Sequence, residues 1–331
     1  MVEPVRVGWH MRYWLIRMSA RDSLARGLAR CLAWISRLLP VGGLFRALPA
    51  LQQRLPAAWR GKDYSLCRQN LEALGYARPQ ARALACRYGA LQLQRAVHER
   101  LYPRSQPQAL RAWVNSIPEV DPQGWPPGSR PALYMLLHTG EYWMAVASVM
   151  AREAAPTRFV IPIWNFADAF TQASLRQLEG LGHRVEVLDA AHPTTALTMA
   201  RALKRGARVI LFCDLPVGLG ALRFGEPLPG RLFNRSAQFV KGPLFLAAKL
   251  KCDALLVGHR AVLGGKGEVR ILTRVRAAPL EVMQKGWMAA LERFIGAAPE
   301  QWLYLPRLEA FYHRQRATAE QRGPTGLGGR R

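Results

Sequence analysis

The chain has 331 residues, of which half are hydrophobic, and a formal net charge of +25 at pH 7. A composition this apolar excludes a largely disordered chain, and the length allows one large domain or two small ones. A positive field of this size favours anionic partners, namely a phospholipid surface, an acidic carrier protein or a nucleic acid. The five cysteines lack paired spacing, so we expect reduced thiols, no disulfide framework and no bound metal.

Residues 1–60 mix arginines with tryptophans and leucines, as in RYWLIRMSARDSLARGLARCLAWISRLLP. This mixture predicts a basic amphipathic helical region that lies in a bilayer interface, where arginine and tryptophan both reach the headgroups. The alternative is a helix that packs on its own domain. No uncharged apolar run of about 18 residues occurs, so a simple membrane-spanning helix is not expected. The arginines within the apolar stretch also do not fit a secretory signal.

Residues 61–315 are expected to form one α/β domain. Apolar residues recur at helical spacing over residues 61–116, and a polar stretch with prolines and glycines, Pro118 to Pro131, ends this helical part. Residues 316–331 have no apolar period and predict a disordered tail.

A sheet core is expected over residues 130–300, because short β-rich runs alternate there with helical segments. The β-rich runs are PALYMLL, RFVIPIW, RVEVLD, RVILFC, DALLVGH and EVRILTRV. The helical segments lie near Glu141–Glu153, Asp168–Leu181, Pro193–Arg205 and Ser236–Lys251. Such alternation predicts an α/β fold with a mostly parallel sheet flanked by helices.

A histidine and an aspartate follow two of these strands. His138 ends the first β-rich run, in LLHTGEYWM, and Asp214 follows the fourth, in LFCDLPVG. Ligands of such sheets bind at the carboxyl ends of the strands, which makes both residues candidates for chemistry. The small residues after His138, ending in Gly140, leave room for a substrate to approach the imidazole. The competing interpretation of His138 is a buried structural histidine.

A histidine that acts as a general base needs an acceptor that fixes its tautomer. Glu141 is close in sequence and Asp214 is plausible on the same rim of the sheet, so either carboxylate is a candidate partner for His138. The alternatives are a helix-start carboxylate that faces water for Glu141, and a loop residue that caps its own turn for Asp214.

A third block, RLFNRSAQFVKGPLFLAAKLKCDALLV, contains Asn234 and Arg235 just before the expected helix Ser236–Lys251. The free N–H groups at a helix start can hold an anion, so this block predicts an anion-binding corner beside an apolar groove. An ordinary amphipathic helix with a good start is the competing interpretation.

Five blocks in order carry a resemblance to a known family. They are SLCRQNLEALGY, HTGEYW, LFCDLPVG, LFNRSAQFVKGPLFLAAKLKCDALLVGHR and PEQWLYLPRLEAF, within about residues 28–311. Together they resemble the late acyltransferases of lipid A biosynthesis, in the lysophospholipid acyltransferase superfamily. In that family a histidine after an apolar strand opens a His–four residues–Asp/Glu motif.

The resemblance implies transfer of a fatty acyl group from acyl carrier protein or coenzyme A to a hydroxyl or amine of a lipid or glycolipid. It implies a membrane-associated enzyme at the cytoplasmic face of the inner membrane, with the acyl thioester as co-substrate and no bound cofactor. His138 would be the general base, with Glu141 or Asp214 as its partner. Gly140, Asn165, Asn234 and Arg235 would bind substrate, and no nucleic-acid motif accompanies the charge.

Two departures from the family pattern carry information. Trp143 stands where the motif has its final acid, so either Glu141 or Asp214 takes over, or the chain is a catalytically impaired relative that binds acyl chains or scaffolds a membrane complex. The run VIPIWN, residues 160–165, replaces a segment that can grip an acceptor phosphate. Ile161 and Trp164 occupy its basic positions, which predicts an acceptor less charged than the phosphorylated disaccharide of lipid A.

Overall fold

The computed structural model describes residues 42–54, 61–101, 106–121, 131–164, 169–219 and 222–312, with four single positions between 27 and 35. Most of the predicted interfacial region, the predicted tail and Asn165 therefore lie outside the described residues. Among the helices that are described, none is long and apolar enough to cross a membrane.

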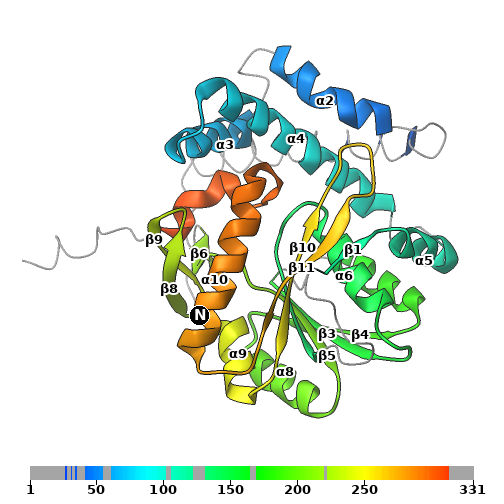
Figure 1. The fold of residues 1–331 in the computed structure, drawn as a ribbon. Coiled ribbons are helices and arrows are strands. Elements are labelled where there is room, and N and C mark those ends of the chain that lie inside the picture. Colours follow the sequence, from blue (N-terminus) through cyan, green and yellow to red (C-terminus); the bar gives the residue numbers. More distant parts are fainter. Residues whose placement is uncertain are drawn as a thin grey trace, which may run out of the picture.

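In the described residues from 42 to 115, four helices form the amino-terminal part: α2 (Gly42–Arg54), α3 (Gly61–Ala73), α4 (Arg78–Leu101) and α5 (Pro107–Asn115). Helix α2 lies along α4 (Figure 1) and buries Phe45 there, so this part of the basic amphipathic region packs on its own domain. On its other side α2 exposes Leu44 and Leu51.

A seven-stranded sheet forms the centre of the molecule, in the order β1-β11-β10-β2-β5-β3-β4. The strands are β1 (Glu119–Val120), β2 (Leu133–Leu136), β3 (Arg158–Ile163), β4 (Arg184–Asp189), β5 (Arg208–Phe212), β10 (Ala254–Arg260) and β11 (Glu268–Val275). All neighbouring strands pair in parallel except β10 and β11. The predicted α/β fold with a mostly parallel sheet flanked by helices is confirmed.

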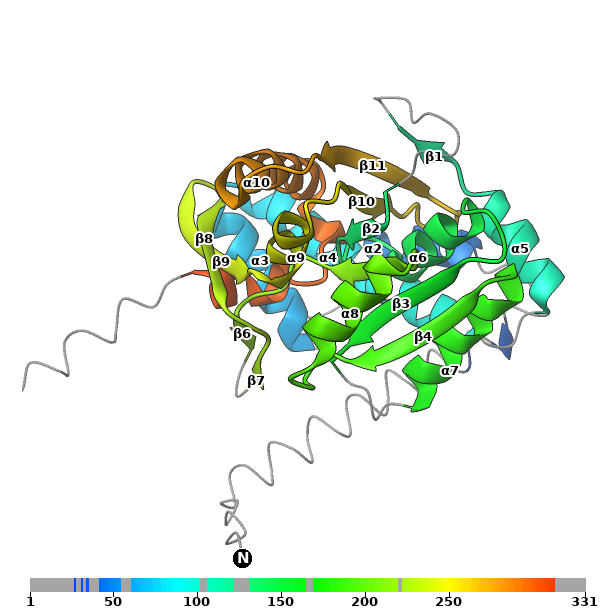
Figure 2. The ribbon, with the colours of Figure 1, turned by 90° about the horizontal axis from the view of Figure 1, so that it is seen from below.

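Helices cover both faces of this sheet (Figure 2). One face packs on α5, α6 (Tyr142–Ala151), α7 (Ala169–Gln177) and the 3-10 turn η3 (Leu178–Leu181). The other face packs on α3, α4, α8 (Thr195–Lys204), α9 (Gly242–Leu250) and α10 (Leu280–Ala297). Alternate side chains of β2 serve the two cores, since Leu133 and Met135 join one and Tyr134 and Leu136 the other.

One predicted helix is partly wrong. Within Ser236–Lys251, the first residues belong to strand β9 (Arg235–Val240), which pairs antiparallel with β8 (Pro227–Leu232), and the helix starts only at Gly242. Phe233 and Asn234 both have positive φ, 51° and 61°, as a two-residue hairpin turn between twisted strands requires. A second short hairpin joins β6 (Gly218–Leu219) and β7 (Leu222–Arg223).

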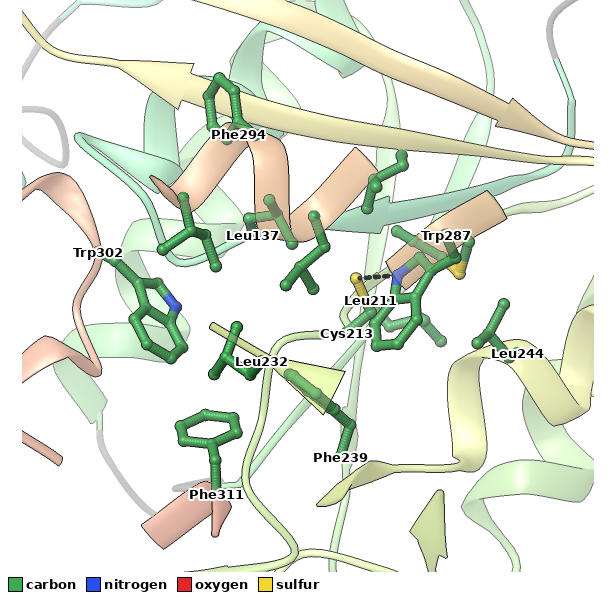
Figure 3. Close-up of a cluster of buried hydrophobic side chains, with 14 of the residues drawn as sticks. Leu137, Leu211, Cys213, Leu232, Phe239, Leu244, Trp287, Phe294, Trp302 and Phe311 are labelled. Atoms are coloured by element: carbon green, nitrogen blue, oxygen red, sulfur yellow. Dashed lines mark hydrogen bonds between the residues drawn. The ribbon is translucent and has the colours of Figure 1, made fainter. Parts of the chain in front are cut away.

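The carboxyl-terminal 3-10 turns, η4 (Pro299–Gln301) and η5 (Leu305–Phe311), close the core beside the β8–β9 hairpin. Figure 3 shows Trp302 and Phe311 from this segment beside Phe239 and Trp287 in one apolar cluster. The Trp287 indole lies edge-on to Phe239 with ring centroids 5.3 Å apart, and its N–H donates to the Cys213 sulfur at 3.3 Å. Because Trp287 joins α10 to the end of β5, it supports the strand that precedes Asp214.

Replacement of Trp287 by alanine should lower the free energy of unfolding by about 3–5 kcal/mol, because the side chain is 1% exposed and leaves a large cavity. Urea unfolding followed by circular dichroism measures this change. Val282→Ala on the same helix is the matched control, since Val282 is 62% exposed and should change stability by less than about 0.5 kcal/mol. Equal losses for both variants would contradict the assignment of the core.

Candidate active site

The strand register brings His138 and Asp214 together. In the parallel pair β2–β5, Leu136 lies opposite Phe212, and His138 and Asp214 each follow two residues later. Asp214 accepts two hydrogen bonds from His138, one from the backbone N–H to Oδ2 and one at ring Nδ1 to Oδ1, both at 2.8 Å. The carboxylate therefore holds both the main chain and the ring of the histidine.

The Asp214 carboxylate is fully buried and receives a third hydrogen bond. The Trp302 indole N–H donates to its Oδ2 at 2.9 Å. Two backbone hydrogen bonds of a β-bridge hold Trp302 in place. The Leu303 N–H donates to the His138 carbonyl at 2.9 Å, and the Gly140 N–H donates to the Gln301 carbonyl at 2.8 Å. Both oxygens of Asp214 accept hydrogen bonds, and the bond to Nδ1 requires the proton of a neutral imidazole to lie on Nδ1. Nε2 is then unprotonated and can accept a proton.

Three aromatic rings, which we call the aromatic rim, surround His138: Tyr142, Phe212 and Tyr304. Phe212 stacks on the imidazole with centroids 4.0 Å apart, while Tyr142 and Tyr304 meet it edge-on at 5.1 and 5.2 Å. The His138 side chain keeps 12% of its surface exposed. The ring is therefore fixed in orientation but reachable from outside, as a general base requires.

Glu141, the other predicted partner, holds a different histidine. Its carboxylate accepts from the Gln94 amide at 2.7 Å and pairs with His98 Nδ1 at 2.6 Å, both on α4. Its backbone N–H donates to His259 Nδ1 at 3.0 Å. Of the two candidates, Asp214 is the partner of His138, and Glu141 ties the loop after β2 to α4 and β10.

The environment of Glu141 favours its charged form. Burial alone would raise the pKa, but the charges of His98 and His259 and the hydrogen bonds from His98 and Gln94 outweigh it and lower the pKa of Glu141 to about 2. Glu141 is thus an ionised structural anchor.

Gly140 allows this anchoring through its backbone. Its φ is +55°, and a Cβ atom there would lie 2.7 Å from His259 Nδ1 and 2.8 Å from the His259 carbonyl oxygen. Any side chain would push the loop after β2 away from the end of β10. Glycine at position 140 was expected to leave room for a substrate. The structure adds a second reason for glycine, which is the close contact with His259.

The helix start expected directly after Asn234 and Arg235 is absent, because these residues belong to the β8–β9 hairpin and α9 begins only at Gly242. The Arg235 guanidinium lies 3.2 Å from Glu309 and 3.6 Å above the Tyr312 ring. The Asn234 carbonyl accepts from Arg231 at 3.0 Å. Asn165 lies outside the described residues, while its neighbour Trp164 packs edge-on against Phe224 at 5.0 Å.

Sequence reasoning missed three residues near His138. Trp302 and Tyr304 stand in the PEQWLYLPRLEAF block, for which no role was predicted. Arg95 lies on α4 in QLQRAVHER, where polar residues at helical spacing, 94, 95, 98 and 99, form a stripe that is buried or partly buried. A polar stripe withdrawn from water is the signal that marks this group.

A narrow pocket lies beside the first turn of α6. It is lined by Glu99, Leu110, Trp143, Met144, Ala147, Ser174 and Leu178. Its walls are mostly apolar, and Trp143 forms one of them. In the described part of the chain, no three His, Cys, Asp or Glu side chains gather as a metal site.

Replacement of Glu141 by glutamine should weaken folding in a pH-dependent way. A carboxyl whose folded pKa is about 2 stabilises the fold above its unfolded pKa near 4.5, and this contribution is lost as the pH falls toward 2. The loss in unfolding free energy relative to the parent should be about 2 kcal/mol smaller at pH 3 than at pH 7. Urea unfolding at both pH values measures it, and an equal loss at both would contradict an ionised anchor.

A scan against models of known protein families finds no match, and a search of curated proteins finds no similar sequence.

Proposed function

We propose that this protein is a membrane-associated acyltransferase that moves a fatty acyl group from acyl carrier protein or acyl coenzyme A to a hydroxyl or amine of a lipid or glycolipid. The observation that carries the proposal is the His138–Asp214 pair at the carboxyl edge of a parallel sheet, braced by Trp302. An oriented imidazole beside a buried carboxylate is the arrangement of a general base for acyl transfer.

The proposed reaction uses His138 twice. Its Nε2 removes the proton from the acceptor O–H or N–H while the acceptor oxygen or nitrogen bonds to the thioester carbonyl carbon. The resulting tetrahedral oxyanion collapses, the carbon–sulfur bond breaks, and the imidazolium returns the proton to the leaving thiolate. Asp214 stabilises the imidazolium between these steps, since its charge lies 2.8 Å from Nδ1.

The alternative is a catalytically impaired relative that binds acyl chains or scaffolds a membrane complex, as Trp143 at the motif position suggests. Trp143 stands where the motif has its acid, but Asp214 can take the place of that acid. Asp214 follows the neighbouring strand and its carboxylate contacts His138. This substitution supports the enzyme over the scaffold.

Charge and exposed apolar side chains support a site of action at the inner face of a membrane. The net charge of +25 suits anionic lipid and an acidic carrier protein. Helix α2 adds two exposed leucines, Leu44 and Leu51, next to the amino-terminal region where tryptophan and arginine are dense.

Both members of the pair should be required for transfer. His138→Ala and Asp214→Asn should each lower kcat roughly 10²- to 10⁴-fold, because the first removes the base and the second its orientation. Release of thiol from an acyl thioester in the presence of membrane lipid measures the rate. His192→Ala is the control, since His192 is an exposed histidine after β4. Full activity of both site variants would favour the scaffold.

The acceptor should carry little charge. Ile161 lies within β3 and Trp164 just after it, where the family has basic residues, and Trp164 packs on Phe224. The purified protein should acylate neutral glycolipids or lipid alcohols faster than a phosphorylated lipid A precursor. Competition between the two acceptors, followed by mass spectrometry of the products, measures the preference. Faster acylation of the lipid A precursor would contradict this assignment.

A further inference from the structure

Arg95 lies close to the proposed base although it comes from a distant helix. Its guanidinium carbon lies 5.0 Å from the centre of the Tyr142 ring, and the same ring meets His138 edge-on at 5.1 Å. Tyr142 therefore links Arg95 on α4 to the imidazole at the end of β2.

In the described part of the chain, the Arg95 guanidinium does not make all the hydrogen bonds that it can donate. The side chain is 15% exposed, and its Nε and Nη1 atoms are buried without a hydrogen-bond partner in the part of the chain that the structure describes. Glu99 lies 3.3 Å from Nε, but its Oε1 is likewise left without a hydrogen bond there. A buried guanidinium with unused N–H groups is costly for the fold, and an anionic ligand group would satisfy it.

Two tyrosine hydroxyls belong to the same group. The charge of Asp214 acts on both Tyr142 and Tyr304, and so does the charge of Arg95. Burial raises the pKa of Tyr142 to about 12, so its hydroxyl stays protonated and can donate a hydrogen bond. Donors of two kinds, a guanidinium and a phenol, thus lie next to each other, and the phenol ring contacts His138.

We propose that Arg95 is a catalytic residue whose guanidinium, with the Tyr142 hydroxyl, holds the oxygen that becomes negative when the acceptor attacks the thioester. This assignment rests on the proposed acyl transfer. Arg235, at the anion-binding corner expected from the sequence, is engaged with Glu309 and Tyr312 instead. Donors that are fixed before the reaction stabilise an oxyanion without reorganisation, and the largely buried position of Arg95 strengthens the effect.

A structural role is the competing explanation, because Arg95 also neutralises Glu99. The two roles separate in a double-variant comparison of Arg95→Met, Glu99→Gln and the combination of both. If Arg95 only balances Glu99, the combination restores both the melting temperature and kcat. If Arg95 holds the oxyanion, the combination restores the melting temperature while kcat stays roughly 10²-fold low.

Kinetics with an acyl thioester provide the first test. Arg95→Met should lower kcat roughly 10²-fold with little change in the KM for the acceptor, and Arg95→Lys should recover part of the loss. Arg87→Met is the matched control, because Arg87 lies on the same helix but is half exposed and pairs with Glu300 at 3.5 Å. Equal kcat for Arg95→Met and the parent would overturn the assignment.

Binding of a tetrahedral anion provides the second test and needs no turnover. The probe is the monoanionic methyl ester of dodecylphosphonic acid, compared with its neutral dimethyl ester by isothermal titration calorimetry. Arg95→Met should weaken binding of the anion roughly tenfold or more and leave the neutral ester unchanged. Equal weakening of both esters would overturn the assignment. A parent protein that binds the anion but releases no thiol would refute the proposed function while retaining the anion site.

Discussion

The Asp214 carboxylate and its three hydrogen bonds determine the geometry of the whole site. A carboxylate withdrawn from water costs several kcal/mol unless its charge is matched. Asp214 is matched by the backbone and ring of His138 and by the indole of Trp302. These donors come from the loop after β2 and from the carboxyl-terminal segment, while Asp214 follows β5. One buried charge thereby joins three parts of the chain that are far apart in sequence.

The rest of the molecule supports this charge. The backbone of residues 138–140 pairs with that of 301–303, which fixes Trp302 against Asp214. Glu141 holds the next residues of the loop to α4, and Asn70 on α3 donates to the Leu305 carbonyl at 2.7 Å. The apolar cluster around Trp287 and Phe239 lies under the end of β5. A second histidine–carboxylate pair, His98 with the buried Glu141, thus positions the loop on which the first pair depends.

Much of the fold follows from the sequence, because alternation of β-rich runs with helical segments allows few architectures. His138 and Asp214 were predictable for the same reason, since parallel strands end at one edge. The choice between Glu141 and Asp214 was not, because it depends on which strands are neighbours and on where α4 places His98. The β8–β9 hairpin was hidden by an apolar pattern in Ser236–Val240 that fits a helix start as well as a strand. The position of Arg95 beside Tyr142 was not predictable, because the polar stripe on α4 does not show which loop this helix packs against.

We propose that Asp214 holds the proton of His138 on Nδ1 and leaves Nε2 as the base. Nuclear magnetic resonance of protein labelled with ¹⁵N in the histidine rings measures the position of this proton, with His138→Ala to assign the signals. For neutral His138, Nδ1 should be protonated and Nε2 unprotonated, and this pattern should change in Asp214→Asn. A neutral ring that carries its proton on Nε2 in the parent protein, or an unchanged pattern in Asp214→Asn, would refute the proposed role of Asp214.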